Sequence, residues 1–181
     1  MRRFLVVCLL ALLLTPSASG WWSSPVVDET TSWLAMRKVS VHCLTAEESA
    51  LDITIVLGAS AYIEGWFDHR GWHPGKYAVY GVGLCETLDA LAAGDVSGLT
   101  VEDVAWAVLV LTHEAGHLRG HRWSGDEAKT ECWAIRHVGY VAYRLGIVDP
   151  AARRLIVGYA LRWHARLPAP YKRRGCVLPS V

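Results

Sequence analysis

The chain has 181 residues, of which 18 are Lys or Arg and 17 are Asp or Glu. Hydrophobic residues make up 52% of it, which is enough for one domain with a buried core. The near balance of charge gives no reason to expect a nucleic acid or an anionic membrane surface as a partner.

Residues 1–20 have the pattern of a signal peptide. Two arginines precede an unbroken apolar run over residues 4–14, and small residues follow it up to Gly20. The run is well short of the ~20 residues that a membrane-spanning helix needs. We therefore expect a secreted protein with no membrane association after cleavage, with an uncleaved N-terminal anchor as the alternative. Residues 21–36 are expected to form a flexible lead-in, and residues 37–181 a single domain.

Four cysteines remain once the signal peptide has removed Cys8. An even number in an oxidising compartment predicts two disulfides, for which three pairings exist. We favour Cys43–Cys85 and Cys132–Cys176, because these pairs connect each half of the chain to itself and attach the C-terminal tail to a helix. No CxxC pair is present, which argues against a structural zinc knuckle.

The first half of the chain has the pattern of a small sheet followed by one helix. Extended segments are expected over residues 37–44, 51–57, 59–66 and 77–82, a Gly-, Pro- and His-rich loop over 68–76, and a helix over 84–93.

The second half is predicted to be helical. Thr100 and Asp103 fit a capping box that begins a helix ending near Arg119. A second helix is expected from about residue 126 to 145. A third begins at Asp149-Pro150 and runs to about residue 166. Strands followed by helices predict an α+β fold.

The sequence His113-Glu114-Ala115-Gly116-His117 falls inside the first of these helices. Residues four apart leave a helix on the same face, so His113 and His117 can bind one ion. Zinc accepts neutral imidazole nitrogens, and its catalytic sites keep one position open for water. Glu114 lies ~100° further round the helix, where it can act as a general base on that water.

A third protein ligand should follow this motif. The metzincin pattern would need a histidine where Trp123 stands, and His121 comes too early for that pattern. Glu127 and Glu131 instead lie one turn apart on the next predicted helix. An antiparallel pair of helices would bring one of these carboxylates over the two imidazoles.

HEAGH followed by E-x-x-T-E resembles the gluzincin zinc metallopeptidases. The resemblance implies a minimal zincin-like α+β domain over residues 37–181. Its small antiparallel or mixed sheet packs on an active-site helix and a glutamate helix, and disulfides brace it. It also implies that Glu127 ligates the zinc ion, while Glu131 accepts the far N–H of a ligand histidine. The wider run, with the ending LPAPYKRRGC, is similar to small uncharacterised exported bacterial proteins.

Glu127 has a second interpretation. Ser124-x-x-Glu127 fits a capping box, in which Glu127 would bond back to the helix N-terminus and Glu131 would become the ligand. We favour Glu127 and keep Glu131 as the alternative.

The remaining polar candidates are weaker. We interpret the loop residues His69 and His73 as solvated. Three further histidines are assigned to the surface or to helix faces: His42, His137 and His164. A donor for a transition-state oxyanion is expected, and the sequence does not select among Tyr62, His137, Tyr140, Tyr159 and Tyr171.

These observations together predict a secreted zinc metallopeptidase. Peptide or protein substrates would be hydrolysed through a metal-bound water that Glu114 activates. The alternatives are a non-catalytic secreted binding protein with a structural or vestigial metal site, and an enzyme that hydrolyses another kind of amide. The sequence does not predict an oligomeric state.

Overall fold

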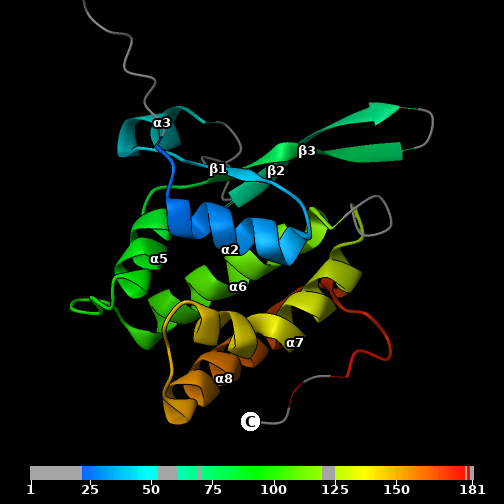
Figure 1. The fold of residues 1–181 in the computed structure, drawn as a ribbon. Helices are drawn as coiled ribbons and strands as arrows, with labels where there is room; N and C mark the ends of the chain where they lie inside the picture. Colours follow the sequence, from blue (N-terminus) through cyan, green and yellow to red (C-terminus); the bar gives the residue numbers. More distant parts are fainter. Residues whose placement is uncertain (1–21, 53–60, 69–70, 120–124, 178, 180–181) are drawn as a thin grey trace, which may run out of the picture.

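The computed structural model describes residues 22–52, 61–68, 71–119, 125–177 and 179. The predicted signal peptide lies outside these residues, as does most of the strand expected over residues 51–57. Within them the chain folds into a small sheet and a larger set of helices, so the predicted α+β class is confirmed (Figure 1).

The sheet has three strands: β1 (Ser40–Cys43), β2 (Ala61–Asp68) and β3 (Gly71–Tyr80). Their order is β1-β3-β2, with β1 parallel to β3 and β2 antiparallel to it. The sheet is therefore mixed. Val41, Cys43, Ala78 and Tyr80 are buried, and they belong to the same hydrophobic core as the helices.

The prediction of a loop over residues 68–76 is wrong, because β2 and β3 form a long hairpin there (Figure 1). Strand β1 pairs only with the part of β3 from Tyr77 onward. Pro74 therefore lies where β3 has a neighbour on one side only, a position at which a proline costs no ladder hydrogen bond. Pairing with β2 outweighs the local preference of Gly and Pro for a turn.

The prediction of a flexible lead-in over residues 21–36 is also wrong, because α2 occupies Pro25–Ala35. The Ser24 side chain accepts a hydrogen bond from the Val27 N–H and caps the helix, with proline in the first turn. Val27, Thr31 and Leu34 are buried along one face, which packs on β1, α5 and α6. This burial orders a segment whose polar composition indicates a loop.

A second unpredicted helix, α3 (Ala46–Leu51), follows β1. A complete capping box begins it: Thr45 accepts from the Glu48 N–H, and Glu48 accepts from the Thr45 N–H.

The helix predicted at the end of the first half and the three predicted in the second half are confirmed. They are α5 (Leu84–Ala92), α6 (Val101–His117), α7 (Glu127–Arg144) and α8 (Pro150–Arg166). A short 3₁₀ helix, η1 (Ala169–Tyr171), follows them. Thr100 and Asp103 form the expected capping box of α6, and Asp149 caps α8 through the Ala151 and Ala152 N–H groups.

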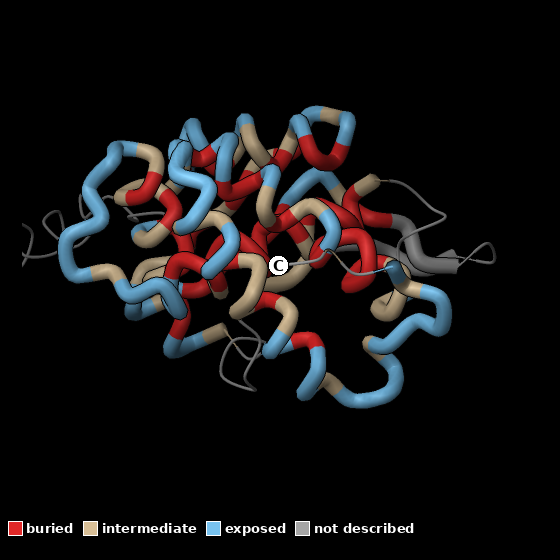
Figure 2. Tube along the Cα trace, turned by 90° about the horizontal axis from the view of Figure 1, so that it is seen from below, coloured by how far each residue is buried: buried red, intermediate tan, exposed pale blue. Residues whose placement is uncertain are grey.

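Helix α6 lies at the centre of the molecule, in contact with α2, α5, α7, α8 and β2. Eleven of its seventeen residues are buried, His117 among them. Most of the others in this buried set are apolar, as expected for a helix that is surrounded by other elements. Buried segments run through the middle of the molecule in Figure 2, and exposed segments form its outline. None of the helices in the described ranges is long and apolar enough to span a bilayer.

Two disulfides brace the fold in the favoured pairing. Cys43–Cys85 connects β1 to α5, and Cys132–Cys176 connects α7 to the C-terminal segment. Disulfides of this kind indicate an oxidising compartment.

Candidate metal centre

His113 and His117 lie on the last two turns of α6, where their rings face one another. Their Nε2 atoms are 3.0 Å apart, and their ring planes meet at 72°. The spacing of four residues thus brings both nitrogens to one point, as the sequence predicts.

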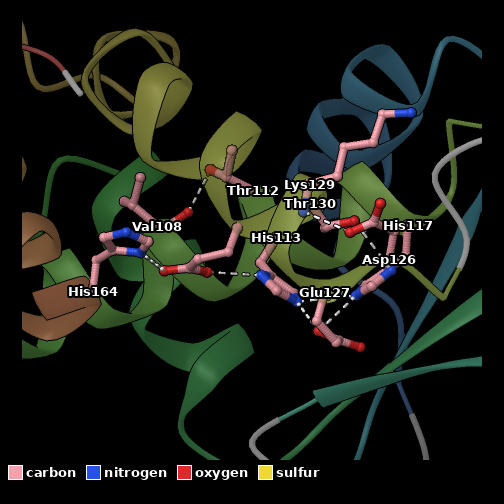
Figure 3. Close-up of polar contacts among 10 residues, drawn as sticks. Val108, Thr112, His113, His117, Asp126, Glu127, Lys129, Thr130 and His164 are labelled. Carbon is pink, nitrogen blue, oxygen red and sulfur yellow. Dashed lines mark hydrogen bonds and ion pairs between the residues drawn. The ribbon is translucent and has the colours of Figure 1, made fainter. Parts of the chain in front are cut away.

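Glu127, the first residue of α7, completes a group of three (Figure 3). Its Oε2 atom lies 3.1 Å from His113 Nε2 and 3.4 Å from His117 Nε2. Three donors at ~2.0–2.1 Å from one tetrahedral zinc ion would be roughly 3.3 Å apart. The two nitrogens and the oxygen therefore fit zinc in both chemistry and spacing.

Asp126, not Ser124, is the N-cap of α7, and its side chain accepts a hydrogen bond from the Lys129 N–H. The capping-box alternative for Glu127 is wrong for that reason. The Glu127 carboxylate turns instead toward the imidazoles, and its side chain is 39% exposed.

Glu131 lies one turn further along α7 and only 4% of its side chain is exposed. Its Oε2 atom is 2.9 Å from His113 Nδ1, on the side of the ring opposite Glu127. Thr130 has the corresponding place at the second imidazole, with its hydroxyl 3.4 Å from His117 Nδ1. The Glu131 carboxylate accepts from the Nδ1–H of His113 and so favours the tautomer with a free Nε2 lone pair. The Thr130 hydroxyl can accept from the Nδ1–H of His117 in the same way.

Gly116, which is not among the predicted site residues, explains how α7 comes so close to α6. A Cβ atom there would lie 2.9 Å from the Thr130 Cγ2 atom and 3.0 Å from the ring of Trp133. A glycine between the two histidines is thus what allows close helix contact. The glycine in HEAGH is the feature of the sequence that could have indicated this close contact.

Glu114 is half-buried beside the metal-binding group. Burial raises the pKa of its carboxyl, and the nearby imidazoles of His113 and His117 offset part of that rise. A glutamate with a raised pKa is a stronger base than an ordinary glutamate, which suits a residue that takes a proton from water.

The electrostatic balance of the group follows from the two carboxylates. Burial favours the neutral form of His113, but hydrogen bonds with Glu127 and Glu131 outweigh it and raise the pKa of the ring to about 10. Hydrogen bonds with His113 and His117 hold the pKa of Glu127 well below its usual range.

Two other predicted residues lie near the site. His164, assigned to a helix surface in the sequence analysis, is buried, and its Nδ1 atom is 3.2 Å from Glu131 Oε1. Tyr171 belongs to η1, which packs on α7. Burial and the carboxylates of Glu127, Glu114 and Glu131 raise the pKa of its phenol.

Three other candidates contact residues outside the group of His113, His117 and Glu127. The Tyr62 hydroxyl donates to Asp52, and the His137 Nδ1 atom lies 2.7 Å from the Trp133 carbonyl oxygen. His42 packs against Tyr77. His69 and His121 lie outside the described residues.

The chain matches no protein-family model, no curated protein and no solved structure. A function can therefore be proposed only from the residues and the geometry of the site.

Proposed function

We propose that the protein is a secreted zinc-dependent metallopeptidase that hydrolyses peptide bonds. The observation that carries the proposal is the convergence of two imidazole nitrogens and one carboxylate oxygen beside Glu114. Two histidines and one glutamate are a ligand set of catalytic zinc sites, in which water takes the fourth position.

In this proposal the three ligands would hold the zinc ion, and Glu114 would transfer the proton. A bound zinc ion would lower the pKa of a coordinated water toward ~7 and polarise the scissile carbonyl. Glu114 would accept the proton of the attacking water while the water oxygen bonds to the carbonyl carbon. When the C–N bond breaks, Glu114 returns the proton to the leaving amine.

Tyr171 is the best candidate for the oxyanion donor. Its helix η1 packs on α7, and the carboxylates of Glu127, Glu114 and Glu131 contribute to the raised pKa of its phenol. A phenol whose pKa is raised stays protonated and can donate a hydrogen bond to the developing oxyanion.

The proposal is tested with Glu114→Gln, which keeps the shape of the side chain and removes the base. We expect wild-type zinc content with peptide hydrolysis reduced roughly 10²–10⁴-fold on a broad peptide library. Glu102→Gln, on the exposed first turn of the same helix, is the matched control and should behave as wild type.

Equal activity of Glu114→Gln and wild type would contradict the proposal. A wild-type protein that binds zinc but cleaves no peptide would instead support the non-catalytic binding protein. Cleavage confined to non-peptide amides would support the third alternative.

A further inference from the structure

A chain of hydrogen bonds runs from the candidate metal centre to helix α8. Glu131 lies in the middle: its Oε2 atom is 2.9 Å from His113 Nδ1, and its Oε1 atom is 3.2 Å from His164 Nδ1. His113 belongs to α6, Glu131 to α7 and His164 to α8. His164 is 8% exposed and Glu131 is 3% exposed, so solvent has little access to this chain.

The direction of each hydrogen bond follows from the ligand role of His113. A ring that binds an ion through Nε2 carries its proton on Nδ1, and that N–H donates to Glu131 Oε2. An ionised carboxylate only accepts hydrogen bonds, so the Nδ1–H of His164 donates to Oε1. Without that donor, Oε1 would be a buried charged oxygen lacking the partner seen here, a situation that proteins avoid.

We infer that His164 is a positioning residue of the metal centre. It fixes the Glu131 carboxylate in the orientation that holds His113 in its ligating tautomer. This inference rests on the proposed metal site and extends it to α8. The carboxylate that orients a ligand histidine is thus itself oriented from a third helix.

The simpler explanation is that His164 only fills the core. Ile156, Ala160 and His164 form the buried stripe of α8, and a histidine at its end would then merely satisfy its own polar atoms. The two explanations differ in what they predict for metal affinity when packing is preserved.

Three substitutions at His164 separate them. His164→Phe keeps a flat ring of similar size and removes the donor. His164→Asn places an N–H donor at the same distance from the backbone as Nδ1, whereas His164→Gln moves the amide one bond further out. His137→Phe is the matched control, because His137 bonds to a backbone carbonyl on α7.

Three measurements are made on each folded protein. Zinc Kd is measured by competition with a chromogenic chelator, and the Co²⁺-substituted protein gives a d–d spectrum of the ligand geometry. Thermal unfolding in excess chelator reports packing without metal. We expect His164→Phe to weaken zinc binding roughly 10–100-fold and to change the Co²⁺ spectrum. His164→Asn should restore both, and His137→Phe should alter neither.

A wild-type zinc Kd and Co²⁺ spectrum for His164→Phe would overturn the inference while leaving the proposed function standing. If that variant does not fold, the comparison of Asn with Gln decides: equal affinities of the two overturn the inference, and weaker binding by Gln alone supports it. Failure of the wild-type chain to bind zinc would overturn the proposed function as well.

Discussion

At the scale of single residues, the site depends on which ring nitrogens carry protons. Glu131 and Thr130 lie at the Nδ1 atoms of His113 and His117, and Glu127 lies at both Nε2 atoms. Each imidazole therefore has one nitrogen held by α7 and one directed to the shared point. This division, more than the spacing of the histidines, makes the pair a ligand set.

The pKa of His113 predicts how zinc affinity depends on pH. Its value of about 10, against 6.5 for an ordinary histidine, means that the ring is protonated at neutral pH. Zinc binding must then release at least that proton, so affinity rises with pH. We expect zinc Kd to fall about tenfold per pH unit from pH 7 to 8.5, measured with a metal buffer. A Kd that does not change over this range would contradict the assignment.

Tyr171→Phe tests the proposed oxyanion donor. Loss of the hydroxyl should lower kcat for peptide hydrolysis by about 10²-fold while zinc affinity stays at the wild-type value. Tyr143→Phe, an exposed tyrosine of α7, is the control. An unchanged kcat would exclude Tyr171 from the reaction, and a loss of zinc would assign it to metal binding instead.

At the scale of secondary-structure elements, the contact between α6 and α7 positions the ligands. The two helices approach through Gly116, and Glu127 is the first residue after the Asp126 cap. The start of α7 thus lies beside the two histidines and presents Glu127 to them.

Gly116→Ala should push these helices apart. Its Cβ would lie within 3.0 Å of Thr130 and Trp133, so we expect a loss of about 1–3 kcal/mol in the free energy of unfolding, together with weaker zinc binding. Gly139→Ala also meets a close neighbour, the Val157 Cγ2 atom at 3.0 Å, but at the contact with α8. It should lose stability and keep its zinc affinity, as chemical denaturation and chelator competition would show. Equal zinc affinity in both variants would argue against a positioning role for Gly116.

The helices of the second half were predictable because their caps and apolar spacing are local signals. Thr100, Asp149 and the HEAGH spacing each act within a few residues, and the structure has them as expected. His164 was not predictable from the sequence, since its partner Glu131 is 33 residues away and the contact depends on how α8 packs on α7. The β2–β3 hairpin was missed for the same reason: strand pairing overrode the turn preference of the residues around Pro74.

At the scale of the whole molecule, each disulfide attaches a peripheral segment to a helix. Cys43–Cys85 holds the sheet to α5, and Cys132–Cys176 holds the segment after η1 to α7, next to Glu131. The second bridge brings the segment that contains Tyr171 to the same helix as two site carboxylates. The parts most distant from α6 in sequence are thereby attached to the helices that surround it.

Metal analysis combined with X-ray absorption is the direct test of a catalytic-type zinc centre at His113, His117 and Glu127. We expect one zinc ion per chain, with two imidazole nitrogens at ~2.0–2.1 Å, one carboxylate oxygen at ~2.0–2.2 Å and one water. Zinc should be lost from His113→Ala and Glu127→Ala. A chain that takes up no zinc, or that retains a full zinc complement in both variants, would contradict this assignment.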